Sequence, residues 1–215
     1  MAKESTFINM SVTLFAVCLI ASAVLGGVYA VTKAPIDAAK VEKINNAIGG
    51  VVPQFDNAPS EEVFTVEVDG KKSNVYPAKM GGEIVGYAIE ASSSKGFGGN
   101  ITLMVGFKAD GSMVKVSVIS HSETPGLGAK IDDSQSHFVT QFEGKNPGDP
   151  NFKMSVTKDG GDVDAITAST ITSRAYCDVL ANAYKAFCEA NKNNVKEEVA
   201  AEPVQETAAS EEAQN

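Results

Sequence analysis

The chain has 215 residues, with 18 Lys and Arg against 27 Asp and Glu, so its formal net charge is −9. Such an acidic chain is a poor partner for nucleic acid, whose phosphates attract positive charge. Three cysteines cannot build a disulfide framework, and two histidines without a C-x-x-C pair disfavour a structural zinc site or a cysteine-ligated cluster. Any redox chemistry therefore requires an organic cofactor.

A long uncharged segment lies near the N-terminus. Residues 6–32 carry no charged side chain, and the stretch 7–31 consists largely of Val, Leu, Ala, Ile and Phe. A helix of this length can cross a bilayer, so we predict a transmembrane helix over 7–31 with residues 1–6 in the cytoplasm. A cleaved signal peptide ending near residues 28–30 is the alternative, but secretory apolar regions run only about 7–15 residues.

The flanking charges say little about orientation, because Lys3 is offset by Glu4 while Lys33 and Lys40 lie on the other side. Long domains translocate largely regardless of charge, so we expect the bulk of the chain to lie outside the cytoplasm. Residues 32–60 are predicted to form a stalk.

That stalk is expected to start at Ala34-Pro35 with a short helix from Ile36 to Ile48. A connection through Gly49-Gly50 and Pro53 would follow.

Residues 61–191 are predicted to form one α+β domain. In this part of the chain, short β-type runs precede a helical one, and Asp110-Gly111-Ser112 supplies a tight hairpin turn between two of the strands. Residues 173–190 then show apolar side chains every three to four positions, which indicates an amphipathic helix packed on an antiparallel sheet. The predicted strands are 63–68, 83–90, 101–109 and 113–120.

The C-terminal segment 192–215 contains two lysines and six glutamates, separated mainly by Ala, Gln and Ser. This composition buries too little apolar surface to offset the entropy of ordering, so we predict a disordered acidic tail. An acidic docking segment is the alternative, although no motif supports it.

Two segments carry the candidate chemistry. The first, residues 121–130, is a Gly/Pro-rich loop directly after the hairpin, where backbone N–H groups can approach a flat or anionic ligand. The second, residues 164–173, holds five hydroxyl side chains where the amphipathic helix begins. One N-cap needs one such residue, so the run also indicates an anion site at the helix N-terminus. By itself, a Gly/Pro-rich loop after a strand is usually a plain turn, and the hydroxyl run has a helix cap as its structural alternative.

Together the two segments resemble a known family. They are similar to the flavin-binding domain of the G subunit of the bacterial Rnf electron-transport complex, and of the related C subunit of the sodium-pumping NADH:quinone reductase. That family has a short N-terminal anchor, an H-x-E-T-P-G-L-G loop and a D-x-x-[ST]-G-A-[ST]-x-T motif. The loop motif matches here at His121, Glu123, Thr124, Pro125, Gly126, Leu127 and Gly128.

The resemblance implies a covalent flavin, because in that family a flavin transferase joins the phosphate of FMN to a threonine by a phosphoester bond. Asp164 matches the acid of the motif, Thr167 its first hydroxyl and Thr170 its second. Thr172 matches the last threonine and is the expected attachment residue, with Thr170 as the runner-up. The loop would pack along the flavin ring, Leu127 covering one face.

The sequence departs from the motif where Gly-Ala becomes Ala168-Ser169. Ala168 is expected to need an ordinary backbone angle, and Ser169 adds a hydroxyl group to the FMN site. We still expect flavinylation. A third glycine-rich piece, residues 95–100, is either a hairpin loop or a further wall of the site.

The resemblance implies an electron-carrying subunit of an ion-translocating ferredoxin:NAD oxidoreductase. The chain would be a single-pass protein of the bacterial inner membrane with its flavin domain on the periplasmic side. Its partners would be the other subunits and, for maturation, the flavin transferase. The alternatives are a counterpart of the C subunit in the sodium-translocating NADH:quinone reductase, or a membrane-anchored binding domain without a cofactor.

Overall fold

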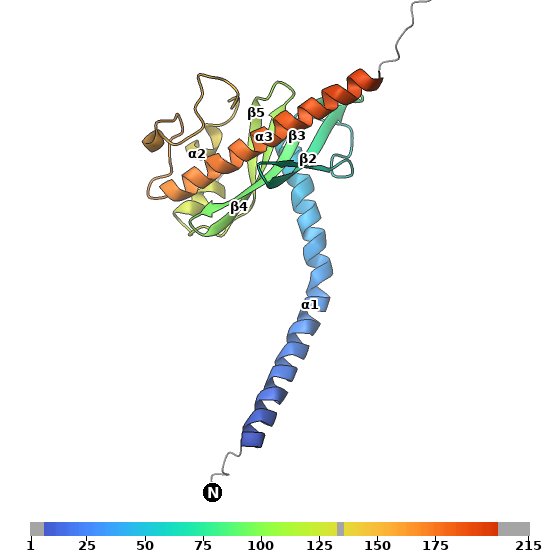
Figure 1. The fold of residues 1–215 in the computed structure, drawn as a ribbon, viewed down its shortest axis with the longest axis vertical. Coiled ribbons are helices and arrows are strands. Elements are labelled where there is room, and N and C mark those ends of the chain that lie inside the picture. Colours follow the sequence, from blue (N-terminus) through green and yellow to red (C-terminus); the bar gives the residue numbers. More distant parts are fainter. Residues whose placement is uncertain (1–6, 133–135, 202–215) are drawn as a thin grey trace, which may run out of the picture. The chain divides into compact units, whose positions relative to one another are not determined.

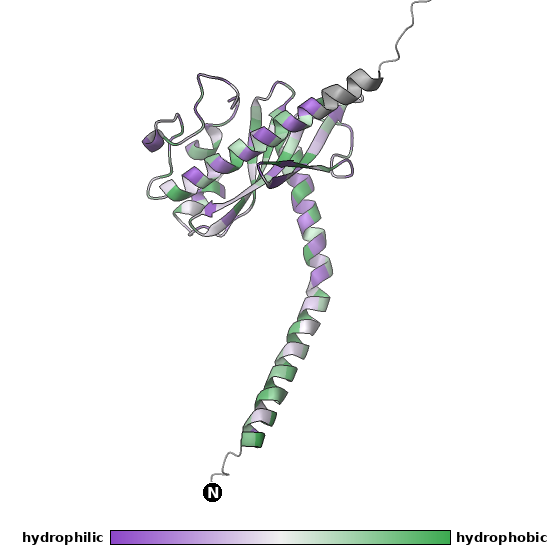
Figure 2. Ribbon diagram, viewed as in Figure 1, coloured by the Kyte–Doolittle hydropathy of each residue, from purple (hydrophilic) through white to green (hydrophobic). Residues whose placement is uncertain are grey.

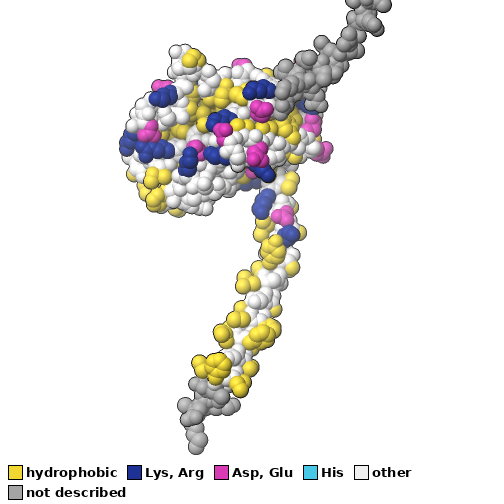
Figure 3. Space-filling view, in the orientation of Figure 1, with side chains coloured by type: hydrophobic (Ala, Val, Ile, Leu, Met, Phe, Trp, Pro, Cys, Tyr) yellow, Lys and Arg dark blue, Asp and Glu magenta, His cyan; other side chains and the backbone are white. Residues whose placement is uncertain are grey.

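The computed structural model describes residues 7–132 and 136–201 and begins with one long helix, α1, at Phe7–Val51 (Figure 1). Its N-terminal part is strongly hydrophobic (Figure 2) and exposes hydrophobic side chains along its surface (Figure 3). The helix is long and apolar enough to cross a membrane. It continues through Pro35, whereas the sequence predicted a new helix there. Proline removes one backbone hydrogen bond, and the rest of the helical ladder can bridge that gap.

The compact unit that follows begins at Asn45, earlier than the boundary at residue 61 that we expected. Three side chains at the end of α1, those of Ala47, Ile48 and Val51, are buried. Gly106 allows this contact, because a Cβ atom there would overlap the carbonyl group of Val51. The last residues of the predicted stalk are therefore part of the folded domain.

A five-stranded antiparallel sheet forms the centre of this unit, with its strands in chain order. This architecture confirms the predicted α+β class. Gly111, which has a φ angle of 85°, makes the predicted turn before the last strand. The strands are β1 (Phe64–Val68), β2 (Lys71–Met80), β3 (Glu83–Gly96), β4 (Gly99–Lys108) and β5 (Met113–Ser120).

Strand β2 was not predicted from the sequence. Its residues include three lysines and Pro77, which are weak strand formers. The pairing of β1 with β2 ends at Phe64 and Val75, so Pro77 pairs only with Tyr87 of β3. Its missing N–H group therefore costs the sheet no hydrogen bond at the β1 side.

One long helix, α3 (Thr170–Ala201), lies across the sheet (Figure 1). It continues beyond residue 191, where the sequence predicted the disordered tail to begin. Residues 192–201 include Lys, Glu and Ala, which are good helix formers, and this favours the extension. Residues 202–215 of the predicted tail lie outside the described part of the chain. The shorter helices are η1 (Gly128–Asp132), α2 (His137–Thr140) and η2 (Thr157–Asp159).

Aromatic rings join α3 to the sheet. Phe107 of β4 stacks on Phe187 of α3 with ring centroids 5.1 Å apart, and Tyr87 of β3 meets the same ring edge-on. Nearer the start of α3, Tyr176 stacks on Phe142, which follows α2 in the chain. These contacts fix the helix on the sheet and so determine where its N-terminus lies.

Asp178 ties α3 to two strands through its carboxylate. The Oδ1 atom accepts a hydrogen bond from Lys95 Nζ at 2.7 Å, while Oδ2 accepts from Ser93 Oγ at 2.7 Å and from Lys71 Nζ at 3.2 Å. Partial burial alone would raise the pKa of Asp178, but these hydrogen bonds outweigh burial and lower the pKa to about 2.

We expect Asp178→Asn to lower the free energy of unfolding at pH 7 by at most about 2 kcal/mol. Because the folded-state pKa lies below the ordinary value, this stabilisation is fully present above about pH 4 and is lost as pH falls through about 2. Urea unfolding of the full chain in detergent at several pH values measures the difference. The matched control is Glu61→Gln, at an exposed carboxylate, which should change little at any pH. If both variants lost the same free energy of unfolding, the hydrogen bonds of Asp178 would not be what stabilises the protein.

Candidate functional site

Three segments that are distant in the sequence meet around a pocket of about 350 Å³. They are the turn between β3 and β4, the loop after β5, and the start of α3. From the sequence, residues 95–100 could be either a hairpin loop or a wall of the site. In the structure they contain the β3–β4 turn, and Phe97 of this turn lines the pocket. The residues that line the pocket are Phe97, Glu123, Thr124, Leu127, Gly128, Ala168, Ser169, Thr170, Ile171 and Thr172.

One carboxylate connects these segments. The Thr172 hydroxyl donates a hydrogen bond of 2.6 Å to Glu123 Oε2, and the Gly98 N–H group donates one of 3.1 Å to Glu123 Oε1. Both side chains are buried, with exposures of 1% for Thr172 and 5% for Glu123. A buried carboxylate requires such donors, so this pair holds the turn, the loop and the helix together.

Glycine is required where the segments approach each other. A Cβ atom on Gly128 would lie 2.5 Å from Glu123 Oε2 and 2.8 Å from Thr172 Oγ1. A Cβ atom on Gly98 would overlap the Ser122 carbonyl group. The glycines of the loop and of the turn therefore allow the Glu123 carboxylate to reach Thr172.

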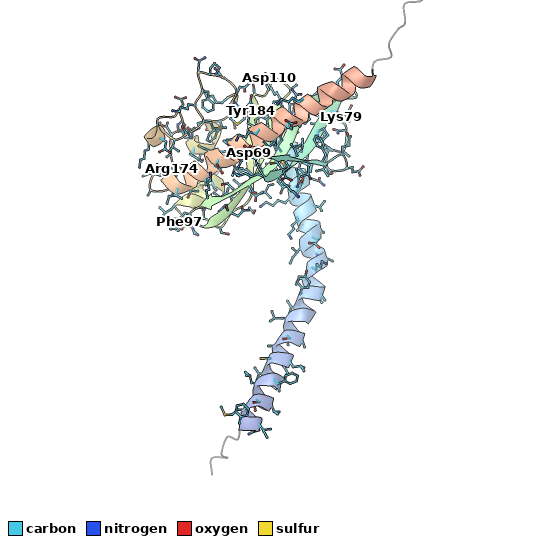
Figure 4. The ribbon with its side chains drawn as sticks, in the orientation of Figure 1. Asp69, Lys79, Phe97, Asp110, Arg174 and Tyr184 are labelled. Atoms are coloured by element: carbon cyan, nitrogen blue, oxygen red, sulfur yellow. The ribbon has the colours of Figure 1, made fainter. Side chains whose placement is uncertain are left out.

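The start of α3 gives the pocket a positive end. The first N–H groups of a helix lack partners within the helix, and its dipole favours an anion there. Lys158 adds a cation, with its Nζ atom 3.3 Å from Thr170 Oγ1. Arg174, near the start of α3 (Figure 4), holds the neighbouring Asp159 through two hydrogen bonds of 2.7 Å. This bidentate pair places η2, and with it Lys158, beside the helix N-terminus.

Lys158 was not predicted as a site residue, because nothing in the local sequence around it marks it. The ion pair between Arg174 and Asp159, whose partners are 15 positions apart, helps to bring the lysine to the site. The hydrogen bonds from the Arg174 guanidinium group also lower the pKa of the Asp159 carboxyl.

Exposed hydrophobic side chains form the rim of the pocket. Phe97, at the tip of the β3–β4 hairpin (Figure 4), is 69% exposed, and Leu127 and Ile171 are each about half exposed. A mostly apolar pocket with a few polar groups is typical of binding sites for small organic ligands.

Five of the predicted site residues are not among the described residues that line the pocket. The His121 ring supports the loop, since its Nδ1 atom accepts a hydrogen bond from the Glu123 N–H group. Pro125 and Gly126 form the turn of the loop. Asp164 and Thr167 are exposed, and the Asp164 carboxylate lies 3.5 Å from His137 Nε2.

Part of the hydroxyl run is structural. The Ser173 hydroxyl donates to the Ser169 carbonyl group and accepts from the Ile166 N–H group, both at 3.0 Å. Ser173, inside the first turn of α3, therefore ties the helix to the segment before it. This differs from the N-cap that the helix-cap interpretation predicted, because the N–H group that Ser173 accepts from belongs to Ile166, outside the helix. Thr172 and Thr170 remain available to the pocket.

The backbone at Ala168 differs from our expectation. Its φ angle is 61°, in the left-handed region, and not the ordinary angle expected for alanine. The turn that leads into α3 thus keeps the conformation that suits glycine, although the residue is alanine. The alanine accepts this strain because the hydrogen bonds around Ser173 fix the residues on either side.

We expect Ala168→Gly to raise the free energy of unfolding by about 1 kcal/mol, because glycine adopts a positive φ angle without the steric cost that alanine carries. Denaturant unfolding of the full chain measures this change. Ala181→Gly, in the middle of α3, is the matched control and should lower stability by a similar amount. A loss of stability in Ala168→Gly would show that the alanine is not strained.

Comparison with known proteins identifies this kind of site. A family model of the FMN-binding domain matches residues 96–185, which include every residue that lines the pocket. The pocket also fits such a ligand, because the start of α3, which favours an anion, lies at one end of it and apolar side chains form its rim, while Lys158 bonds to Thr170 of the lining. The chain is therefore a protein with an FMN-binding domain.

Curated relatives give the particular family. The chain is 37% identical over 177 residues to the G subunit of the ion-translocating oxidoreductase complex of Aliivibrio fischeri, a match that covers 78% of this chain and 82% of the relative. Matches to the G subunits of Shewanella baltica (47% identical) and Vibrio atlanticus (44% identical) cover 50% and 55% of this chain. They span only 51% and 56% of those relatives. The chain belongs to the family of G subunits of the ion-translocating oxidoreductase complex.

Proposed function

We propose that this chain is the electron-carrying subunit of a membrane-bound ion-translocating ferredoxin:NAD oxidoreductase complex. It holds FMN through a phosphoester bond to Thr172. The observation that carries this proposal is the Thr172 hydroxyl, which lies in the pocket between the two motifs and bonds to Glu123. Bound FMN supplies one- and two-electron chemistry, and the protein supplies its position and surroundings.

The residues of the pocket have distinct tasks in this proposal. The N-terminus of α3 and Lys158 offset the negative charge of the phosphate. Phe97 and Leu127 contact the flavin ring at the rim, where it stays accessible to electron-transfer partners. A covalent tether keeps the cofactor in place outside the cell membrane, where lost flavin is not recovered.

The relatives favour this proposal over the role of a C subunit in the sodium-translocating NADH:quinone reductase, because those compared above are named as G subunits of the ion-translocating complex. Helix α1 anchors the chain in the bacterial inner membrane, and the flavin domain lies on the periplasmic side. The other subunits of the complex are its partners, and a flavin transferase attaches the FMN.

The test is to produce the full chain in three bacterial strains: one without flavin transferase, one with an exported transferase, and one with a transferase retained in the cytoplasm. The chain is purified in detergent and denatured, and the flavin that stays with the protein is measured by absorbance. We expect one FMN per chain only with the exported enzyme. Flavin that is lost on denaturation in every strain would refute covalent attachment, and flavin added by the retained enzyme would refute the periplasmic orientation.

A further inference from the structure

Glu123 is placed for more than support of the loop. Its carboxylate is buried, lines the pocket, and accepts the Thr172 hydroxyl at 2.6 Å. A threonine hydroxyl is a weak nucleophile unless an adjacent base takes its proton. A general base must lie within about 2.6–3.2 Å of the atom it deprotonates, and Glu123 Oε2 satisfies this requirement.

We infer that Glu123 is the general base that activates Thr172 for attachment of the flavin phosphate. This inference rests on the proposed phosphoester at Thr172. The donor it requires is a flavin phosphoanhydride. The bond from Oγ1 to phosphorus forms while the bond from Oγ1 to hydrogen breaks, and the proton moves to Glu123 Oε2. The phosphoanhydride P–O bond breaks, its electron pair leaves with the departing phosphate group, and nothing is oxidised or reduced.

The same geometry explains how the product is accommodated. The phosphoester carries a negative charge beside Glu123, and two adjacent anions in a buried site destabilise each other. A Glu123 that keeps the transferred proton is neutral and donates a hydrogen bond to the phosphoester. The base thus becomes a hydrogen-bond donor to the product without further rearrangement.

Close packing holds the carboxylate in this position. Cβ atoms on Gly96 and Gly128 would each lie 2.5 Å from one of its oxygen atoms, so both glycines allow the carboxylate to sit between the segments. The hydrogen bond from the Gly98 N–H group to Oε1 leaves Oε2 directed at Thr172. This arrangement assigns the two oxygens different tasks, with Oε1 as the anchor and Oε2 as the base.

Two substitutions separate a base from a merely structural residue. Glu123→Gln keeps the size of the side chain and an oxygen acceptor but cannot take a proton. Glu123→Asp keeps the carboxylate but shortens the side chain, so it disturbs packing more. If Glu123 acts as a base, FMN should attach faster to Glu123→Asp than to Glu123→Gln. If Glu123 only supports the structure, FMN should attach faster to Glu123→Gln.

The experiment mixes each purified full-length variant in detergent with flavin transferase and its flavin donor and follows intact mass over time. We expect Glu123→Gln to be at least about 100-fold slower than wild type with an unchanged KM for the donor, and Glu123→Asp to fall between them. Unfolding midpoints of both variants confirm that each is folded. A glutamine variant as fast as the aspartate variant, or faster, overturns the inference.

The outcome for the wild type separates this inference from the proposed function. If wild type gains FMN at Thr172 and Glu123→Gln gains it equally fast, the attachment stands and the base is wrong. If wild type gains no FMN at Thr172, the proposed attachment fails, and the role of Glu123 fails with it.

Discussion

Replacement of Thr172 by alanine is expected to abolish covalent attachment of FMN. A phosphoester needs a hydroxyl oxygen, and the Thr172 hydroxyl both lines the pocket and bonds to Glu123. Intact mass of the full chain, produced with flavin transferase, should show no addition in Thr172→Ala. Wild type should gain the mass of one FMN less one water.

The matched control is Thr170→Ala. Thr170 lines the same pocket two positions earlier, but its hydroxyl is bonded to Lys158 rather than to a carboxylate. We expect this variant to carry as much FMN as wild type. Loss of FMN from Thr170→Ala together with retention in Thr172→Ala would move the attachment site to Thr170.

Folding of the Thr172 variant needs a separate check. The substitution leaves Glu123 Oε2 without its buried donor, which costs about 1–3 kcal/mol. Thr172→Ser keeps the hydroxyl group and should therefore retain both stability and some FMN. A folded Thr172→Ala without flavin, compared with a flavin-bearing Thr172→Ser, attributes the loss to the hydroxyl.

The second large effect is expected in the core. Phe107 is fully buried on β4, and its ring stacks on Phe187 at 5.1 Å and lies 6.0 Å from Tyr184. Phe107→Ala removes these contacts and leaves a cavity between the sheet and α3, at a cost of about 3–5 kcal/mol. Because domains have only about 5–15 kcal/mol of stability, this is a large share of the total.

Urea unfolding of the full chain in detergent, followed by circular dichroism, measures this loss. Phe97→Ala is the control, since Phe97 is largely exposed at the rim of the pocket. Its substitution should change the free energy of unfolding of the flavin-free protein by less than about 0.5 kcal/mol. Similar losses in the two variants would show that Phe107 does not anchor α3 to the sheet.

The sequence predicted much of the fold because local signals marked it. Four strands, the turn at Gly111 and the final helix followed from alternation, turn residues and helical spacing. Strand β2 was not predicted, because lysine and proline are weak strand formers. The sheet tolerates them here because the positions of the lysines and Pro77 each pair with a neighbouring strand on one side only. That circumstance depends on the pairing of β1, which no local pattern reveals.

The site was predictable to a similar extent. The resemblance marked both motifs, and the structure brings Glu123 and Thr172 together although they are 49 positions apart. Their hydrogen bond could not be derived from spacing, because it depends on how α3 packs on the sheet. Lys158 was missed for the same reason, and the positive φ angle of Ala168 contradicts the ordinary propensity of alanine.

The central claim is that FMN is attached to Thr172, and peptide mapping tests it most directly. Trypsin cleavage after Lys158 and Arg174 releases residues 159–174, a peptide that contains every hydroxyl of the motif. Tandem mass spectrometry of this peptide, from chain produced with flavin transferase, locates the modified side chain. We predict fragment ions that place the FMN phosphate on Thr172. A modification on Thr167, Ser169, Thr170 or Ser173, or an unmodified peptide, would contradict the account.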